Sequence, residues 1–255
     1  MNVFAGWHVA LLVVILAIIA LLIVLVVRSR RRARAAAEPP TTVVSVTLSL
    51  AALWAIFSVI GAIIATLTIL LQTQVQITIP VQEYWPQLPQ GVFVEGTTAT
   101  RISGGFTSAD LTVEGLSMGT RVVWVIGQAL GYLVPAAIAG LIAVACFHLL
   151  AGRAFAPVVA RMSMITAVVV AAGGVAAQML DDIAGSMAAD QVLRYTGGGW
   201  KDIPGIEDPL QAWWPDPTLT IQFPLLPIGA GLAFAALAAI LKYGSRLQRD
   251  TEGLV

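Results

Sequence analysis

The stretch "VVSVTLSLAALWAIFSVIGAIIATLTILL", residues 43–71, contains no charged residue. A helix of about 20 apolar residues crosses the roughly 30 Å hydrocarbon core of a bilayer. The stretch is therefore long enough to span a membrane and to tilt within it or project beyond it. Its apolar residues form a continuous run and do not alternate with polar ones, so the pattern predicts a helix and excludes a strand of a membrane barrel.

Four further runs have the same character. The chain of 255 residues is 58% hydrophobic and only 11% charged, whereas about 25% of residues are charged in soluble domains. We therefore predict an all-α polytopic membrane bundle with five transmembrane helices. The additional runs cover residues 6–27, 122–150, 162–180 and 221–241.

The predicted spans divide the chain into two parts. Residues 1–42 are expected to form an N-terminal anchor helix with a basic cytoplasmic linker, and residues 43–255 a four-helix membrane core. A signal peptide is the alternative interpretation of the first run. No Lys or Arg precedes that run, and it is longer than the apolar region of a signal peptide, so an anchor is favoured.

The distribution of basic residues predicts the orientation of the chain. Residues 28–42, 151–161 and 242–255 hold 10 of the 14 Lys and Arg residues but 3 of the 14 Asp and Glu residues. Because segments rich in Lys and Arg stay on the cytoplasmic side, the N-terminus is expected outside and the C-terminus in the cytoplasm. The formal net charge of zero would then combine a basic inner face with an acidic outer face.

Two outer loops, residues 72–120 and 181–220, are expected to carry the mass outside the membrane. In "QVQITIP" (74–80), apolar and polar residues alternate, as is typical of a strand with one buried face. "GVFVEG" (91–96) and "ADLTVEGL" (109–116) are further strand candidates, so we predict a small extracytoplasmic sheet. The fourth helix is expected to continue into the second loop, until "TGGGW" (196–200) ends it.

Adjacent carboxylates at Asp181 and Asp182 form a candidate outer polar site. A carboxylate within a membrane is a functional candidate by default, whereas a pair at the interface is simply solvated, and the sequence leaves both interpretations open. Small residues predict close helix packing, within the chain or at a dimer face. They are Gly127 and Gly131, which form a G-x-x-x-G motif, and Gly173 with Gly174.

Residues that could support metal binding or catalysis are few. His8 and His148 have no Cys or carboxylate at ligand spacing, and the single Cys146 cannot form a disulfide within the chain. No catalytic triad or phosphate-binding loop can be assembled. We therefore predict no metal, no cofactor, no nucleic-acid partner and no enzymatic activity.

The tail "KYGSRLQRDTEGLV", residues 242–255, has a mixed pattern of charge. Its basic residues recur at helical spacing and share one face, which on the inner side would meet an anionic leaflet or an acidic partner. A topology anchor is the simpler alternative. The acidic residues of the tail are expected to pair with the basic loop at 151–161 or to meet a second protein. The candidate inner contacts are Arg153, Arg161, Lys242, Arg246, Arg249, Asp250 and Glu252.

Two short motifs carry a family resemblance. "GRAF" (152–155) and "YGSRLQRDTEGLV" (243–255) resemble motifs of a family of small bacterial membrane proteins of unknown function, typically with four helices. The matching positions are Gly152, Arg153, Phe155, Gly244, Leu247, Gln248, Asp250, Glu252, Leu254 and Val255. The resemblance covers residues 43–255 and implies a bacterial plasma membrane and, often, a gene beside a helix-turn-helix regulator. The extra first helix and the large outer loops depart from the family pattern.

These observations favour a regulatory, sensory or accessory membrane subunit without catalysis. Its expected partners are the lipid bilayer, a protein at the cytoplasmic face and further copies of the chain. A small transporter or channel component that acts as an oligomer is the alternative. The two differ in the bundle interior, because a transporter needs polar side chains that face a cavity within its spans.

Overall fold

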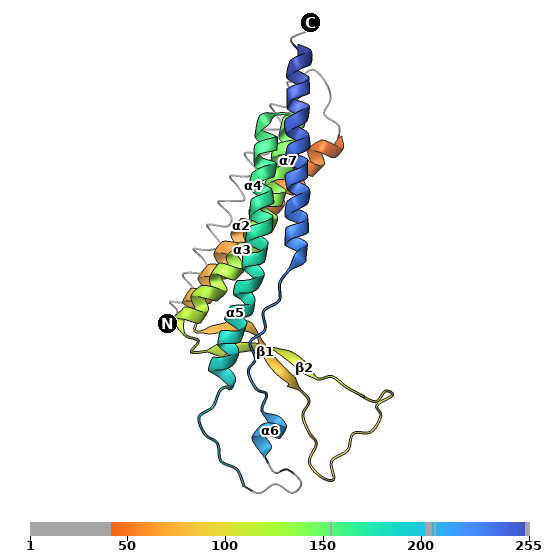
Figure 1. Cartoon of the computed structure of the whole chain (residues 1–255). Coiled ribbons are helices and arrows are strands. Elements are labelled where there is room, and N and C mark those ends of the chain that lie inside the picture. Colours follow the sequence, from red (N-terminus) through yellow and green to blue (C-terminus); the bar gives the residue numbers. More distant parts are fainter. Residues whose placement is uncertain (1–41, 154, 202–205, 207, 253–255) are drawn as a thin grey trace. The chain divides into compact units, whose positions relative to one another are not determined.

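The structure is a computed structural model, and it describes residues 42–153, 155–201, 206 and 208–252 (Figure 1). Side chains are described as far as residue 248. The expected first span at 6–27 and the linker as far as residue 41 lie outside the described residues.

Four helices among the described residues are long and apolar enough to cross a membrane. This confirms the helical prediction for the other four apolar runs and supports a membrane-embedded protein. The third helix in chain order contains a short π-helical segment, η1, between two α-helical parts, and is continuous from Pro157 to Leu193. The elements are α2 (Thr42–Leu71), α3 (Met118–Leu150), α4 (Pro157–Val168), η1 (Val169–Gly173), α5 (Gly174–Leu193) and α7 (Leu225–Glu252).

Several helix ends differ from the expected spans: α4 begins at Pro157 and not at 162, and α7 extends past 241 to Glu252. The starts of α3 and α7 differ for local reasons. Helix α3 begins at Met118, before the apolar run, because the Ser117 hydroxyl accepts a hydrogen bond from the backbone N–H of Thr120 at 3.3 Å and caps the first turn. Helix α7 begins at Leu225 and not at 221. Pro224 disfavours helical backbone at the residue before it, so the helix starts after this proline.

The chain divides into two compact units, and each is described by itself. The first, called here the helical unit, comprises the described parts of Met1–Ile64, Ala129–Val175 and Pro224–Val255. The second, called the sheet unit, comprises Ala65–Gln128 and Ala176–Phe223.

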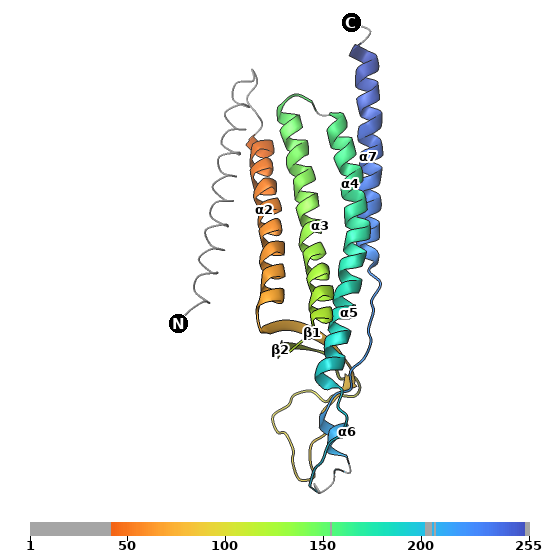
Figure 2. The same ribbon diagram turned by 90° about the vertical axis from the view of Figure 1, so that its left-hand side faces the viewer.

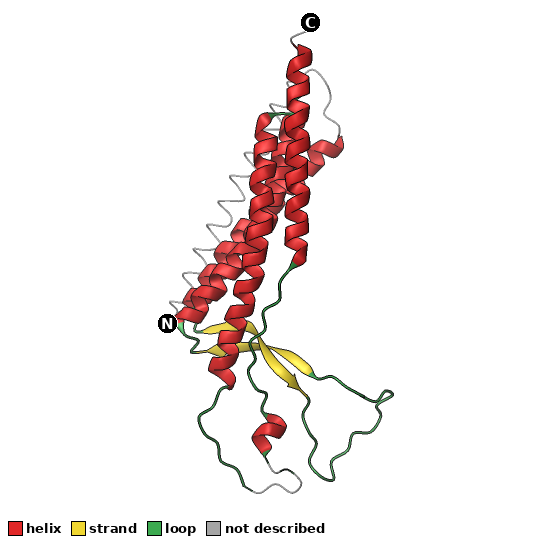
Figure 3. Ribbon diagram, viewed as in Figure 1, coloured by secondary structure: helices red, strands yellow, loops and turns green. Residues whose placement is uncertain are grey.

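The sheet unit contains an antiparallel pair, β1 (Gln74–Tyr84) and β2 (Phe106–Glu114), with Gln74 opposite Glu114 (Figure 3). The alternation predicted for 74–80 is confirmed, since Val75, Ile77 and Ile79 are buried. The prediction of a strand at 91–96 is wrong. This segment is a loop whose end residues, Gly91 and Gly96, have φ angles of 86° and 87°, and positive φ interrupts extended backbone.

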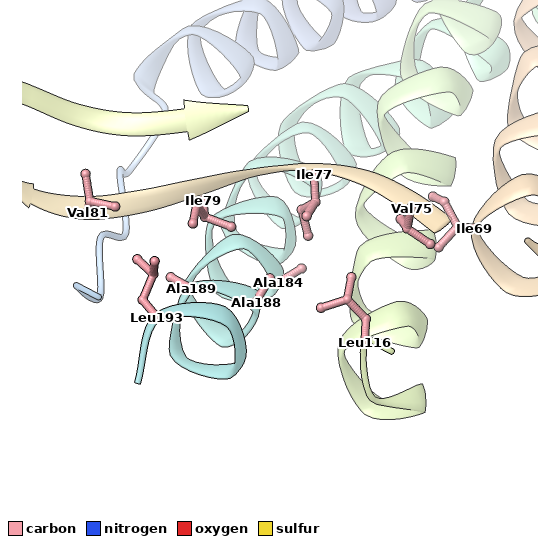
Figure 4. Close-up of a cluster of buried hydrophobic side chains, with 10 residues drawn as sticks. All are labelled: Ile69, Val75, Ile77, Ile79, Val81, Leu116, Ala184, Ala188, Ala189 and Leu193. Carbon is pink, nitrogen blue, oxygen red and sulfur yellow. The ribbon is translucent and has the colours of Figure 1, made fainter. Parts of the chain in front are cut away.

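The core of the sheet unit lies between β1 and α5 (Figure 4). Ala184, Ala188 and Ala189 are fully buried there, opposite the apolar face of β1. Small residues are required, because a Cβ atom on Gly185 would lie 2.6 Å from the carbonyl oxygen of Thr78. The helical continuation expected past residue 180 therefore serves as the platform for the strand.

The second loop also contributes to the sheet unit. A short helix, α6 (Pro209–Trp213), is capped by the Asp208 carboxylate. After α6 the chain runs along β1, where the N–H of Gln82 donates to the carbonyl oxygen of Asp216 at 2.9 Å. Both edges of β1 thereby gain backbone partners, β2 on one side and this segment on the other.

In the helical unit α4 and α7 lie side by side (Figures 1 and 2). A Cβ atom on Gly231 would lie 2.8 Å from the carbonyl oxygen of Ala167, so glycine permits this approach. A second apolar cluster joins Leu141 of α3 to Ala156 and Val159 at the start of α4. Phe234 and Leu241 of α7 pack against the same cluster.

Candidate functional site

The described residues of "GRAF", Gly152, Arg153 and Phe155, lie in the turn between α3 and α4. Gly152 has a φ of 70°, and its N–H donates to the carbonyl oxygen of Leu149 at 3.0 Å. The N–H of Arg153 donates to the carbonyl oxygen of His148 at 2.9 Å. This pair of bonds is a Schellman motif, which satisfies the last carbonyl groups of α3 and requires a residue that tolerates positive φ. The motif explains Gly152, while the Arg153 side chain is exposed.

The two segments that carry the family resemblance contact each other in the helical unit. A Cβ atom on Gly244 would lie 2.5 Å from Cδ1 and 2.6 Å from Cε1 of Phe155. The ring of Phe155 therefore rests directly on the backbone of α7 at Gly244. Two motifs almost 90 positions apart in the chain thus form one packing contact.

A groove of about 760 Å³ lies beside this contact, between α4 and α7. Its basic side chains come from both helices: Arg161 from α4, and Lys242 and Arg246 from α7. Its apolar side chains come from both helices as well. They are Pro157, Ala160, Met164, Ala238 and Ala239, with Tyr243 and Ser245 completing the lining. We call this feature the basic groove.

The structure brings three of the seven predicted inner contacts together in this groove. Arg153 lies outside the lining. The side chains of Arg249, Asp250 and Glu252 lie outside the described residues, so their predicted ion pairs stay predictions. The backbone of α7 remains helical to Glu252, and the tail therefore continues the helix to that point.

The electrostatics of the helical unit favour an anionic ligand at the basic groove. The described side chains of the helical unit include four Lys or Arg residues and no Asp or Glu. The N-terminus of α4 adds to this positive potential: its N-cap, Ala156, provides no side-chain cap, and Pro157 at the first helical position lines the groove. Helix N-termini attract anions through unpaired N–H groups and the helix dipole.

The predicted outer polar site lies in the sheet unit, and its two carboxylates have different surroundings. Asp182 accepts hydrogen bonds from Gln178 Nε2 at 2.9 Å and from the backbone N–H of Gln222 at 2.7 Å. The Ser186 hydroxyl next to it donates to the carbonyl oxygen of Asp182 at 2.8 Å. Asp182 therefore fastens the end of the second loop to α5.

Asp181 is less well satisfied. Its Oδ2 accepts a hydrogen bond from Gln128 Nε2 at 3.3 Å, while its buried Oδ1 has no partner among the described residues. A Cβ atom on Gly127 would collide with Oδ1 and lie 3.1 Å from Cγ. The absent side chain at Gly127 is thus what accommodates the Asp181 carboxyl group.

The other predicted packing glycines differ among themselves. Gly174 allows Pro227 to approach, since a Cβ atom there would lie 2.7 Å from Pro227 Cβ. A Cβ atom on Gly173 would make an ordinary contact with Val134 at 3.4 Å, and one on Gly131 would meet nothing within 4 Å. Gly127 and Gly174 therefore occupy close contacts, whereas Gly131 leaves an open surface.

Arg121 is a structural residue that the sequence pattern did not single out. Its guanidinium donates to the carbonyl oxygens of Gln72 at 2.6 Å and Thr73 at 2.9 Å, and to those of Ile69 and Leu116 at 3.2 and 3.3 Å. It thereby caps the C-terminus of α2, where a cation complements the helix dipole. Its position beside an apolar run, in the first turn of α3, was the available signal.

Candidate metal ligands are not clustered. Among the side chains that the structure describes, no group of three or more His, Cys, Asp or Glu residues could hold a metal ion. Comparison with known proteins gives no match: no family model, no curated protein and no solved structure matches the chain. The basic groove and the Asp181 site therefore rest on their own geometry.

Proposed function

We propose that this protein is a regulatory, sensory or accessory subunit of a bacterial plasma membrane, without catalysis of its own. In this proposal the N-terminus and the sheet unit are outside, and the "GRAF" turn and the C-terminal tail are cytoplasmic. The basic groove is its inner docking site, and the sheet unit is its sensing or binding region. The family resemblance of "GRAF" and the tail supports the bacterial membrane assignment.

One observation carries the proposal: the described helical unit has its Lys and Arg side chains only in the α3–α4 turn, the first part of α4 and the C-terminal part of α7. The rest of its described helices has no Lys, Arg, Asp or Glu, and the buried Nδ1 of His148 has no partner among the described residues. The buried polar side chains in these helices are hydroxyls, and the Ser163 hydroxyl donates to Val159 of its own helix at 2.9 Å. A solute path would need polar groups directed at a cavity, so an accessory role fits better.

Exposed apolar surface favours assembly with other helices. Within each span, only 11–28% of the most apolar stretch is buried in the chain. Lipid covers such surface readily, and so do transmembrane helices of a partner or of further copies. The same surface would serve an oligomeric transporter. Asp181, with one unpaired oxygen, is the residue that favours this alternative.

The orientation can be tested by cysteine labelling. Cys146→Ala removes the natural thiol, and Asp250→Cys then places a thiol in the tail. An impermeant maleimide should label this variant only after the cells are permeabilised. Ile102→Cys is the matched control, because Ile102 is 96% exposed in the sheet unit and should be labelled in intact cells. Labelling of position 250 in intact cells would contradict the proposed topology.

The role itself can be tested by reconstitution and crosslinking. Purified protein in liposomes should leave ion and proton gradients intact, and crosslinking in native membranes should yield a defined complex that persists through purification. A flux that the purified chain supports alone, and that Asp181→Asn abolishes, would establish the transporter alternative and overturn the accessory role.

A further inference from the structure

We infer that the basic groove between α4 and α7 specifically binds one anionic phospholipid. Arg161, Lys242 and Arg246 hold the phosphate of its headgroup between them. This inference deepens the proposed function, on which it rests, because it names the ligand class at the inner docking site.

The arrangement of charge distinguishes this site from a general basic surface. Positive side chains converge from two helices: Arg161 enters from α4, and Lys242 and Arg246 enter from α7, one helical turn apart. No Asp or Glu is present among the described side chains of the helical unit. Among the side chains described there, no carboxylate neutralises these three positive charges. Arginine suits a phosphate especially well, since its planar guanidinium binds two oxygens at once.

The start of α4 provides a second, independent attraction for the phosphate. Pro157, the first residue of the helix, lines the groove, and no side chain caps this terminus. Pro157 has no N–H, and the N–H of Val159 donates to the carbonyl oxygen of Ala156 at 2.9 Å, so the attraction at this terminus comes from the positive end of the helix dipole.

The walls of the groove fit the remainder of a phospholipid. Met164 lies one turn beyond Arg161 along α4, and Ala238 and Ala239 lie one turn before Lys242 along α7. An acyl chain could follow this apolar lining while the phosphate stays at the charged end. A free phosphate would leave the apolar walls uncovered, and an acidic peptide would have to bring polar backbone groups against them. The combination of cationic end and apolar walls therefore points to a lipid.

The test uses the full chain in detergent and measures lipid binding by native mass spectrometry. Phosphatidylglycerol should bind at least about 10-fold more tightly than phosphatidylcholine. Both headgroups carry a phosphate, but the cationic choline of phosphatidylcholine is repelled by the three basic side chains. Arg161→Ala or Arg246→Ala should reduce that preference by about 10-fold, and Lys242→Arg should preserve it. Inorganic phosphate at millimolar concentration should not compete.

Arg153→Ala is the matched control. It removes the same charge from the neighbouring turn, from a residue that does not line the groove, and should change the preference by less than about twofold. An equal loss in Arg153→Ala and Arg161→Ala would mean diffuse attraction to a basic surface and would overturn the inference. Competition by inorganic phosphate would mean a soluble-anion site and would overturn it as well.

A second measurement needs no variant. A phosphatidylglycerol with a photoactivatable acyl chain should label peptides that contain Met164 or Ala238 in the unaltered protein, and labelling confined to α2 and α3 would contradict the site. The outcomes also separate the two proposals. Selective lipid binding in a protein whose tail is labelled from outside contradicts the proposed function alone, whereas lost selectivity with a cytoplasmic tail contradicts the groove alone.

Discussion

The contact between Phe155 and Gly244 predicts that Gly244→Ala destabilises the protein when Phe155 is present. The same substitution is expected to stabilise the protein when Phe155 is replaced by Ala. Replacing Gly by Ala within a helix gains about 1 kcal/mol from helix propensity. Against this gain, the new Cβ would lie 2.5 Å from the Phe155 ring, and overpacking costs about 1–3 kcal/mol. Gly244→Ala should therefore lower the free energy of unfolding by up to about 2 kcal/mol.

The same substitution made together with Phe155→Ala no longer meets the ring. It should then stabilise the protein by about 1 kcal/mol relative to Phe155→Ala alone. The coupling between the two sites equals the overpacking cost, about 1–3 kcal/mol. A double-mutant cycle measures this energy directly, by equilibrium unfolding in mixed micelles of dodecylmaltoside and dodecyl sulfate, followed by circular dichroism.

Gly229→Ala provides the control within the same helix. A Cβ atom on Gly229 would meet nothing within 4 Å, so this substitution should stabilise the protein by about 1 kcal/mol with or without Phe155. The reasoning would be refuted if Gly244→Ala matched Gly229→Ala in both backgrounds. That result would mean that "GRAF" and the tail are not in contact.

Three further predictions follow from individual contacts. Arg121→Ala should lower the free energy of unfolding by about 3 kcal/mol, since it removes charged hydrogen bonds to backbone carbonyls; Arg121→Lys should restore only part of this in the same unfolding assay. Asp182→Ala should lower the free energy of unfolding by about 2 kcal/mol because the N–H of Gln222 loses its acceptor. Asp181→Asn should change thermal stability little. Equal effects of the two substitutions would contradict the assignment of different roles to these residues. Deletion of 250–255 should reduce recovery of a crosslinked partner without changing lipid selectivity, and unchanged recovery would show that the tail is no docking element.

The sequence determined the features that depend on pattern along the chain. Length and continuous apolarity are enough to predict helices over 43–71 and 122–150, because a helix satisfies its own backbone hydrogen bonds within one segment. The alternation at Val75, Ile77 and Ile79 likewise predicted which face of β1 is buried. "GVFVEG" was misassigned for the same reason: its local pattern suits a strand, but a strand also needs a paired neighbour, and the glycines at its ends have positive φ.

Which of several similar residues matter depends on packing between segments that are distant in the chain. Asp181 and Asp182 are adjacent and chemically identical, yet one keeps an unpaired oxygen and the other holds the loop at Gln222. Successive residues on a helix point about 100° apart, so neighbours in sequence meet different partners in space. The basic groove arises in the same way. Arg161 and Lys242 are far apart in the chain, and their common site exists because α4 and α7 pack together, a fact that depends on contacts between segments and not on the pattern within either one.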